Sequence, residues 1–420
     1  MIRFVHTADI HLGMENYGKI DAKTGIHTRL LDFSRALDYC IDVAIDHHID
    51  LFIFAGDAYK TAHPTQTHQK LLFQSFMRLY KANIPIVIII GNHDNPLSFG
   101  KAHALDIVST MPFDGFHVVA KPTILALQTK SGPINVVGIP WPTRNSIALA
   151  DKNIAASATD ITQYISRSVA TIIKNFAAQL DPSVPAVLAA HLTVANGIFS
   201  GSEKRAIYGI DPLFLPSELA IAPFDYVALG HLHRYQNLMQ NGSPAVVYSG
   251  SLERIDFGER NDEKGFCLVT IAAKGETHHE FIKTPTRPFV QIEVILRARE
   301  VPFTQQIIEE ITKHTIKDAI VKIVYHLPSH SLDTVDLKTV QHACHAAHYV
   351  VGIFPIRKKE VREQRTHIFG SASTDVPTLL SLYCDTKPAL KEKKDILISL
   401  TKELIVEYER AMHEKTGESV

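Results

Sequence analysis

The sequence predicts an α/β protein whose core is a sandwich of two β-sheets flanked by helices, followed by a small α+β domain and a pair of helices. Short apolar runs rich in β-branched residues alternate with longer segments of helical periodicity, which indicates strands joined by helices. Five of these runs end in Asp, Asn or His, as strands leading into a binding site do. Near residue 245 the alternation passes into closely spaced strands.

The first part of the chain contains two strands and two helices. Residues 2–8 form the first expected strand, and a polar loop that contains glycine covers 12–27. We expect a helix at 29–47, because its apolar residues recur at helical spacing. A buried strand at 51–55 and a helix at 65–81 follow.

The central strand lies within residues 84–90, which contain a Pro and six apolar residues, mostly β-branched, and are followed by a Gly. Such a continuous apolar run is typical of a strand buried on both faces. The later elements that we expect are a short helix near 101–110, strands at 116–119, 124–126 and 134–139, a long helix at 159–179, and strands at 186–190 and 226–229.

The pattern changes at Thr284-Pro-Thr-Arg-Pro288, which marks a domain boundary. The stretch before it, with strands at 246–248 and 265–270, looks antiparallel. After it, an alternating strand, two helices and a second strand indicate a small α+β domain, and a basic and polar linker follows. The expected divisions are 1–284, 285–355, 356–374 and 375–420.

Two helices close the chain, at about 376–384 and 389–412. A lone helix pair cannot bury an apolar stripe by itself, so we expect this pair to dock on a partner or on its own chain. The stripe consists of Leu397, Leu400, Leu404, Ile405 and Tyr408.

Composition narrows the class of protein. The chain has 420 residues, 45% hydrophobic and 21% charged, with a net charge of −1. Any contact with nucleic acid must therefore depend on local patches, a partner subunit or metal ions, because there is no global basic field. Its four cysteines show no C-x-x-C spacing, which argues against a disulfide framework or a zinc knuckle. Without a leader or a membrane-spanning apolar run, a soluble cytoplasmic protein is expected.

Polar side chains follow the strands of the expected sheets. Because the carboxyl ends of parallel strands meet at one edge, these side chains should converge. Oxygen and imidazole ligands without thiolate fit Mn²⁺, Fe²⁺ or Zn²⁺ better than an all-oxygen Mg²⁺ or Ca²⁺ cage, although Mg²⁺ stays possible. The candidate ligands exceed the ~4 of a single structural zinc, so two metals sharing one carboxylate are expected. They are Asp9, His11, Asp57, Asn92, His191, His231 and His233.

The charges of such a centre point to its substrate. Two divalent cations would be only partly neutralised by Asp9 and Asp57, and the remaining charge of about +2 suits an anionic phosphate ester. Two ions ~3.5–4 Å apart can hold its oxygens and ionise a water near neutral pH.

The order Asp-x-His, Gly-Asp, Gly-Asn-His-Asp, His and Gly-His-x-His resembles the calcineurin-like metallophosphoesterase superfamily. The resemblance implies that His93 does not bind metal but lies over the scissile phosphate and protonates the leaving oxygen, with Asp94 holding its ring. It implies one metal on Asp9, His11, Asp57 and His233. It implies a second, bridged by the same aspartate, on Asp57, Asn92, His191 and His231.

Three further stretches are similar to nuclease subunits of the SbcD type: His6–Gly13, Tyr248–Glu259 with Lys264-Gly-Phe266, and Pro-Thr-Arg-Pro-Phe at 285–289. This resemblance implies a manganese-dependent nuclease of DNA repair, recombination and replication, a 3′→5′ exonuclease on duplex ends and an endonuclease on single strands or hairpins. It also implies a DNA-binding cap at 285–355, an SbcC-like SMC ATPase bound by the C-terminal helices, and a homodimer formed through helices near 65–81 and 101–110.

One departure from the resembled pattern concerns DNA contacts. Some relatives carry a histidine three residues after the bridging Asp, where this chain has Lys60, which can contact phosphate as a point charge. Arg144, Arg254 and Lys264 are further candidates, with ordinary salt bridges equally expected. Two other functions stay open: a small-molecule phosphodiesterase or phosphatase on the same core, and a weakly catalytic subunit that tethers DNA ends.

Overall fold

The computed structural model describes residues 1–96, 101–109, 114–143, 158–201, 211–239, 244–298, 300–329, 331–357, 375–385, 387, 390 and 392–416. The chain divides into two compact units. The first consists of Met1–Leu327 and Ser331–Ile356, and the second of Pro328–His330 and Arg357–Val420.

The first of two six-stranded sheets contains the N-terminus. Its strand order is β14-β13-β1-β2-β3-β4. Neighbours from β1 to β4 pair in parallel, whereas β13 pairs antiparallel with β1 and with β14. The strands are β1 (Ile2–Thr7), β2 (Leu51–Phe54), β3 (Ile86–Ile89), β4 (Phe116–Val119), β13 (Gly265–Ala273) and β14 (Glu276–Lys283).

The second six-stranded sheet has the order β11-β12-β10-β7-β6-β5. Its strands are β5 (Thr123–Thr129), β6 (Gly132–Ile139), β7 (Ala186–His191), β10 (Tyr226–Gly230), β11 (Gln236–Asn237) and β12 (Ala245–Tyr248). Strand β10 pairs in parallel with both β7 and β12. A separate two-stranded ribbon joins β8 (Thr193–Val194) to β9 (Leu213–Phe214).

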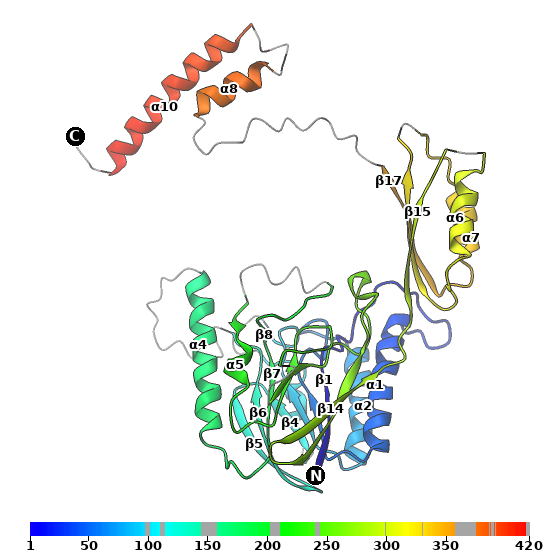
Figure 1. The fold of residues 1–420 in the computed structure, drawn as a ribbon, viewed down its shortest axis with the longest axis vertical. Coiled ribbons are helices and arrows are strands. Elements are labelled where there is room, and N and C mark those ends of the chain that lie inside the picture. Colours follow the sequence, from blue (N-terminus) through cyan, green and yellow to red (C-terminus); the bar gives the residue numbers. More distant parts are fainter. Residues whose placement is uncertain are drawn as a thin grey trace. The chain divides into compact units, whose positions relative to one another are not determined.

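Helices cover the outer faces of the two sheets. Figure 1 shows α1 (Thr28–Asp46) and α2 (Gln66–Lys81) on one side of the strands, and α4 (Ala158–Ala177) and α5 (Pro216–Leu219) on the other. The expected α/β sandwich of two sheets with helices outside is confirmed. The helix expected near 101–110 is only the short α3 (Asp106–Ser109) within the described residues.

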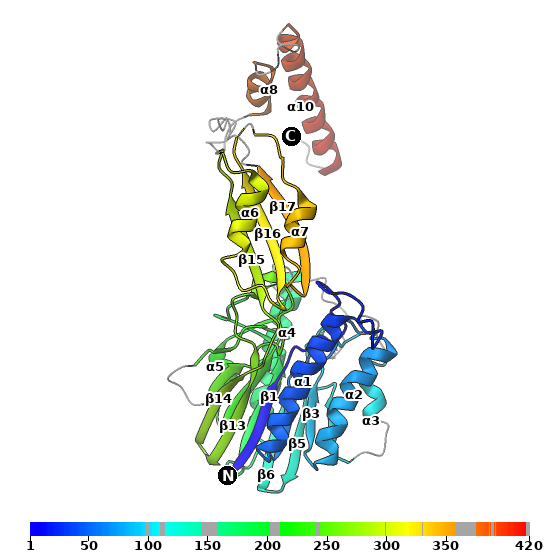
Figure 2. The same ribbon diagram turned by 90° about the vertical axis from the view of Figure 1, so that its right-hand side faces the viewer.

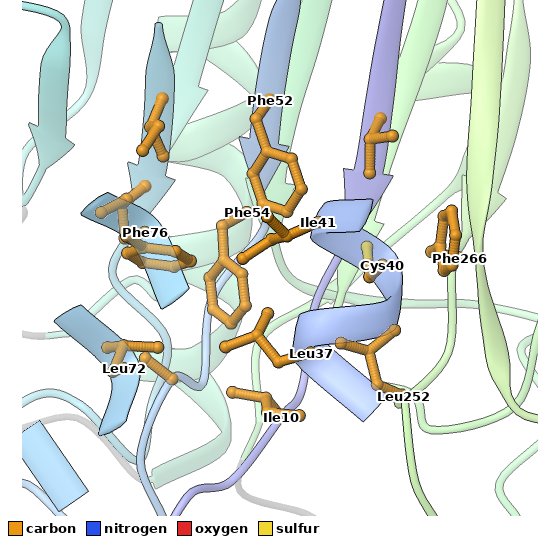
Figure 3. Packing of buried hydrophobic residues seen from close by; sticks show 14 of the residues in the cluster. Ile10, Leu37, Cys40, Ile41, Phe52, Phe54, Leu72, Phe76, Leu252 and Phe266 are labelled. Carbon is orange, nitrogen blue, oxygen red and sulfur yellow. The ribbon is translucent and has the colours of Figure 1, made fainter. Parts of the chain in front are cut away.

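The continuous apolar runs are explained by burial on both faces of each strand. In β2, Phe54 packs toward α1 and α2, whereas Ile53 faces the core between the sheets. The ring of Phe54 lies 5.8 Å from that of Phe76 in α2, with Leu37 of α1 nearby (Figure 3). A strand with apolar neighbours on both faces needs no polar alternation.

The segment after the boundary forms a three-stranded sheet, β15 (Phe289–Ile295), β16 (Ile320–Leu327) and β17 (Tyr349–Arg357). Helices α6 (Phe303–Ile311) and α7 (Leu337–Ala343) lie against one face of this sheet (Figure 2). Its junction with the sandwich is held by Arg287, whose Nε and Nη2 each donate at 2.8 Å to the carboxylate of Asp32 in α1. We refer to this part as the small domain.

The second unit contains α8 (Val376–Asp385) and α10 (Lys394–Thr416), which contact each other. Leu404 and Tyr408 of the expected apolar stripe are 63% and 66% exposed. Most of the expected linker 356–374 lies outside the described residues. None of the helices in the described ranges is long and apolar enough to cross a membrane.

Strand pairing differs from the expectation in one region. The sequence pattern predicts that the strands near 246–248 and 265–270 continue as an antiparallel meander, but β12 lies in the second sheet, parallel to β10, and β13 lies in the first, antiparallel to β1. Apolar patterning locates a strand but carries no information about its partner, which is decided by the distant segment that completes the same layer.

Candidate metal centre

The loops that carry the polar side chains depend on glycines that permit close approach. A Cβ on Gly91 would lie 2.1 Å from Asp57 Oδ1, and one on Gly56 would lie 2.2 Å from His191 Nδ1. Both separations are far below van der Waals contact. The Gly-Asp and Gly-Asn spacing in the sequence therefore reflects backbone passing directly against candidate ligands.

Four candidate ligands have left-handed backbone conformations: φ is 54° at Asp9, 47° at His11, 57° at Asp57 and 108° at His231. Residues with a Cβ rarely adopt this region, at a cost of about 1–3 kcal/mol each. Such conformations cluster at functional sites, where the surroundings hold them in place.

The first group of ligand atoms comes from Asp9, His11 and His233, which lie within 4.8 Å of one another. His11 Nε2 faces His233 Nε2 at 3.1 Å, and it lies 3.6 Å from Asp57 Oδ2. Two imidazole nitrogens beside a carboxylate form a site that a divalent cation fits.

The second group surrounds Asn92. Its Oδ1 lies 2.9 Å from His191 Nε2 and 3.2 Å from His231 Nδ1. Asp57 Oδ2 is 3.5 Å from His191 Nε2 and thus close to both groups. The structure therefore brings all seven candidate ligands together, with Asp57 between the two groups.

Neighbouring groups orient two of the histidines. His191 Nδ1 lies 2.8 Å from the Ala55 carbonyl oxygen; a carbonyl only accepts, so Nδ1 donates and Nε2 has the lone pair for a cation. His233 Nδ1 lies 2.8 Å from Glu259 Oε1, and Glu259 Oε2 is 2.8 Å from Lys264 Nζ. Glu259 is a residue that the sequence interpretation missed as part of the site, although it lies in a stretch similar to the SbcD type.

The side chain of Lys264 is buried, so the prediction that it contacts phosphate is wrong. Its Nζ donates to the His233 carbonyl oxygen and to Ser251 Oγ, each at 2.9 Å, and pairs with Glu259. Both members of the ion pair are fully buried. Lys264 therefore stabilises the backbone at His233 and the position of Glu259.

The charges of the site are strongly coupled. Burial alone would raise the pKa of the Asp57 carboxyl, but the imidazoles of His191 and His11 outweigh it and hold that pKa far below its usual range. Burial raises the pKa of Asp9 to about 6, although His191 and His233 oppose the shift. Burial would lower the pKa of His191, but Asp57 and Asp9 raise it to about 9. A divalent cation at this point would replace the proton on His191.

His93 is exposed beside the two groups. Its Nδ1 lies 2.8 Å from the Lys60 carbonyl oxygen and must donate to it, which leaves Nε2 as the proton-exchanging atom. Its backbone N–H donates to Asp57 Oδ1 at 2.9 Å. The ring also lies 4.8 Å from that of His11, and one of its nitrogens lies within 4.8 Å of ligand atoms on His11 and Asp57. Position alone therefore allows it to act as a ligand or as an acid.

Asp94 does not hold the His93 ring as expected. Its carboxylate accepts backbone N–H groups from Tyr59 at 3.0 Å, Gly91 at 3.1 Å and Ala58 at 3.2 Å. Asp94 therefore ties the backbone after Asp57 to that of Gly91, while the carbonyl oxygen of Lys60 orients the imidazole of His93.

The other residues predicted to contact DNA differ in exposure and in position. The side chain of Lys60 is exposed, and the carbonyl oxygen of this residue lies beside His93. The guanidinium of Arg254 donates to Thr286 Oγ1 at 2.5 Å and to the Asp262 carbonyl oxygen at 3.0 Å, which places it in the junction with the small domain. Arg144 lies outside the described residues.

Trp141 is a second residue that the sequence interpretation missed. It follows β6 at the edge where the candidate ligands converge, and its ring lies 4.8 Å from that of His231. The signal was available, because a single tryptophan directly after a strand at this edge stands beside the predicted site.

Comparison with known proteins agrees with this geometry. The family model for calcineurin-like phosphoesterases matches residues 2–235. The SbcD subunit of the SbcCD nuclease from Bacillus subtilis (strain 168) is 28% identical over 303 residues, covering 69% of this chain and 72% of that protein.

Two solved structures also match over 67% of this chain. One, from Thermus thermophilus, is 14% identical and covered over 98% of its length, with a TM-score of 0.37. The other, a dimetal phosphatase from Danio rerio, is 8% identical and covered over 99%, also with a TM-score of 0.37.

Proposed function

The chain belongs to the calcineurin-like phosphoesterase family, and we propose that it is a two-metal DNA phosphodiesterase, the nuclease subunit of an SbcCD-like complex. The observation that carries this proposal is the convergence of two aspartates, one asparagine and four histidines from five strand ends at one edge of the sandwich. The similarity to a protein named as a nuclease subunit supports DNA as the substrate.

The proposed ligands divide as the two groups do, with Asp57 shared. Mn²⁺ is the preferred cation, because it accepts both hard carboxylate and amide oxygens and borderline imidazole nitrogens, and no thiolate is present; Mg²⁺, Fe²⁺ and Zn²⁺ are alternatives. The first metal is assigned to Asp9, His11, Asp57 and His233. The second is assigned to Asp57, Asn92, His191 and His231.

When bound, the two divalent ions would stabilise charge on the phosphate and lower the pKa of a water molecule. His93 supplies the acid. Donation from its Nδ1 to the Lys60 carbonyl leaves Nε2 to carry a proton to the leaving oxygen. Lys60 itself could hold a neighbouring phosphate as a point charge.

The surfaces beyond the centre fit such a subunit. We assign the small domain to DNA binding and the apolar stripe on α10 to an SbcC-like SMC ATPase, because Leu400, Leu404 and Tyr408 of this stripe are exposed, and exposed apolar residues at helical spacing are the means by which a helix docks in an apolar groove. A homodimer through α2 and the segment near 101–110, and cleavage as a 3′→5′ exonuclease and single-strand or hairpin endonuclease, complete the proposal.

Two alternatives are separated by substrate. A small-molecule phosphodiesterase would hydrolyse cyclic nucleotides or small aryl phosphodiesters faster than DNA. An architectural tether would bind DNA ends with little hydrolysis.

The test is nucleotide release from end-labelled linear duplex DNA with Mn²⁺ or Mg²⁺, with and without the ATPase, beside a cyclic nucleotide at equal concentration. We expect Mn²⁺-dependent release of nucleotides and little turnover of the cyclic ester. Turnover of the cyclic ester alone would overturn DNA as the substrate. The Asp57→Ala variant is the control for contaminating nuclease.

A further inference from the structure

We propose that Trp141 is a positioning residue that holds His231, and with it the second of the two proposed metals, so this inference rests on the proposed function. Trp141 is the single tryptophan of the chain. Its backbone N–H donates to the Ile90 carbonyl oxygen at 2.9 Å, which ties the end of β6 in the second sheet to the end of β3 in the first. The indole is therefore fixed at the edge where the proposed ligands meet.

The indole contacts two of the proposed ligands of the second metal. Its ring centroid lies 4.8 Å from that of His231, at an interplanar angle of 36°, and 6.0 Å from that of His191, at 70°. Both distances are within the range of aromatic contacts.

His231 lacks a support that three other histidines in or beside the centre have. In His191, in His233 and in the proposed acid His93, the ring Nδ1 lies 2.8 Å from an acceptor oxygen of another residue. Such a bond fixes both the rotation and the tautomer of a ring. In His231, Nδ1 faces Asn92 Oδ1 at 3.2 Å, on the side assigned to the metal.

The other nitrogen of His231 has no hydrogen-bond partner among the described residues. This Nε2 is buried, and Asp211 Oδ2, itself unsatisfied, lies 3.8 Å away, beyond hydrogen-bonding distance. The φ of 108° at His231 also places the side chain on a strained backbone. The orientation of this ring therefore depends on packing, in which Trp141 at 4.8 Å is closer than the ring of His191 at 5.3 Å.

The magnitude follows from the energy of an aromatic pair. Loss of such a contact corresponds to a change of about twofold to twelvefold in an equilibrium constant. Because the ring contacts of Trp141 are with His231 and His191, both assigned to the second metal, the change should appear in one site.

The experiment is a calorimetric titration of the full chain with Mn²⁺ in the wild type and in Trp141→Leu, Trp141→Phe and Asp211→Asn. We expect Trp141→Leu to weaken one of two sites by about twofold to twelvefold, and Trp141→Phe to restore most of that affinity. Asp211→Asn should bind both ions as the wild type does. Thermal unfolding checks that each variant is folded, and Trp141→Met replaces Trp141→Leu if that variant does not fold.

A second readout needs no variant. All tryptophan fluorescence of the wild type arises from Trp141, so occupation of the second site by paramagnetic Mn²⁺ should quench it, with a midpoint equal to the calorimetric one for that site. Unchanged affinities in the non-aromatic variants, equal weakening of both sites, or a loss seen only in Asp211→Asn would overturn the role of Trp141. A wild type that binds no Mn²⁺ would instead refute the proposed centre, and the assignment of Trp141 with it.

Discussion

Glu259 connects the proposed metal ligand His233 to the buried ammonium of Lys264. Its replacement by glutamine removes the negative charge between them and changes the shape of the side chain very little. One carboxylate oxygen lies 2.8 Å from His233 Nδ1 and the other 2.8 Å from Lys264 Nζ. Burial opposes the charge on Glu259, but Lys264 and His233 outweigh it and hold its pKa far below the usual range. Glutamine has almost the same shape, but it can accept from only one of these donors, and its NH₂ group would face the other.

Two effects of different size follow. If the amide oxygen accepts from His233, the Lys264 ammonium is left buried beside a donor, and breaking a buried pair in this way costs about 3–5 kcal/mol of unfolding free energy. If the amide turns over, the imidazole loses its acceptor, and loss of such support typically weakens metal binding about 10–100-fold. In either orientation the neutral amide removes the ion-pair partner of Lys264, so the variant should be less stable; its Mn²⁺ affinity should fall to the extent that the NH₂ group faces His233.

The assay combines urea unfolding with calorimetric Mn²⁺ titration. Glu263→Gln is the matched control, because Glu263 pairs with Lys283 on the surface, where the two side chains are 60% and 64% exposed, and such pairs are worth about 0–1 kcal/mol. A Glu259→Gln protein with wild-type stability and wild-type Mn²⁺ affinity would refute the assigned support of His233.

Four further variants test the general acid, the glycine beside Asp57, a buried histidine and the apolar stripe on α10. His93→Ala should retain Mn²⁺ and DNA binding but lower the cleavage rate by about 10²–10⁴-fold, as loss of a general acid does, measured in single-turnover assays; unaltered cleavage would remove its role. Gly91→Ala places a Cβ 2.1 Å from Asp57 Oδ1, so it should destabilise the fold by about 1–3 kcal/mol and reduce Mn²⁺ stoichiometry in calorimetry, whereas full stoichiometry would contradict the contact. Burial lowers the pKa of His6 to about 3, so the unfolded chain takes up a proton below its own pKa of ~6.5 while the folded chain does not. Unfolding free energy should therefore fall by about 2 kcal/mol from pH 7 to pH 5 through this residue alone, and His6→Gln should lose that part of the fall in urea titrations; an identical fall in both proteins would refute it. Leu404→Glu changes a 63% exposed side chain, so it should leave thermal unfolding unchanged and abolish binding to the ATPase coiled coil in fluorescence anisotropy, and retained binding would exclude this face.

The candidate ligands could be found from the sequence because local patterns determine them. Each of the five segments is a short apolar run that stops at a polar residue, and parallel pairing brings such ends to one edge. The glycines before Asp57 and Asn92 are part of the same local signal, since a Cβ at Gly56 or Gly91 would collide with a candidate ligand.

The contacts that support those ligands could not be predicted, because they join residues distant in the chain, although the place of Trp141 after a strand could be read from the sequence. Glu259 is 26 positions from His233, and Trp141 reaches His231 only through packing of the second sheet. Adjacency also misled the interpretation of Asp94, whose carboxylate binds the backbone of Ala58 and Tyr59 rather than the neighbouring imidazole.

The pairing of the strands also could not be predicted from the sequence. The apolar patterns near 246–248 and 265–270 located β12 and β13, but not their separation into two sheets. Burial of Cys267 and Val247 on the two sides of one core between the sheets decides that arrangement, and this long-range packing leaves no local trace in the sequence.

The most direct test of the central claim is the number of Mn²⁺ ions bound per full-length chain, measured by elemental analysis after equilibrium dialysis, in the wild type and in Asp57→Ala. A shared carboxylate predicts two ions in the wild type and loss of both in the variant, with His93→Ala still holding two. A wild type that binds none, or an Asp57→Ala chain that keeps one ion at unchanged affinity, would contradict a centre bridged by Asp57.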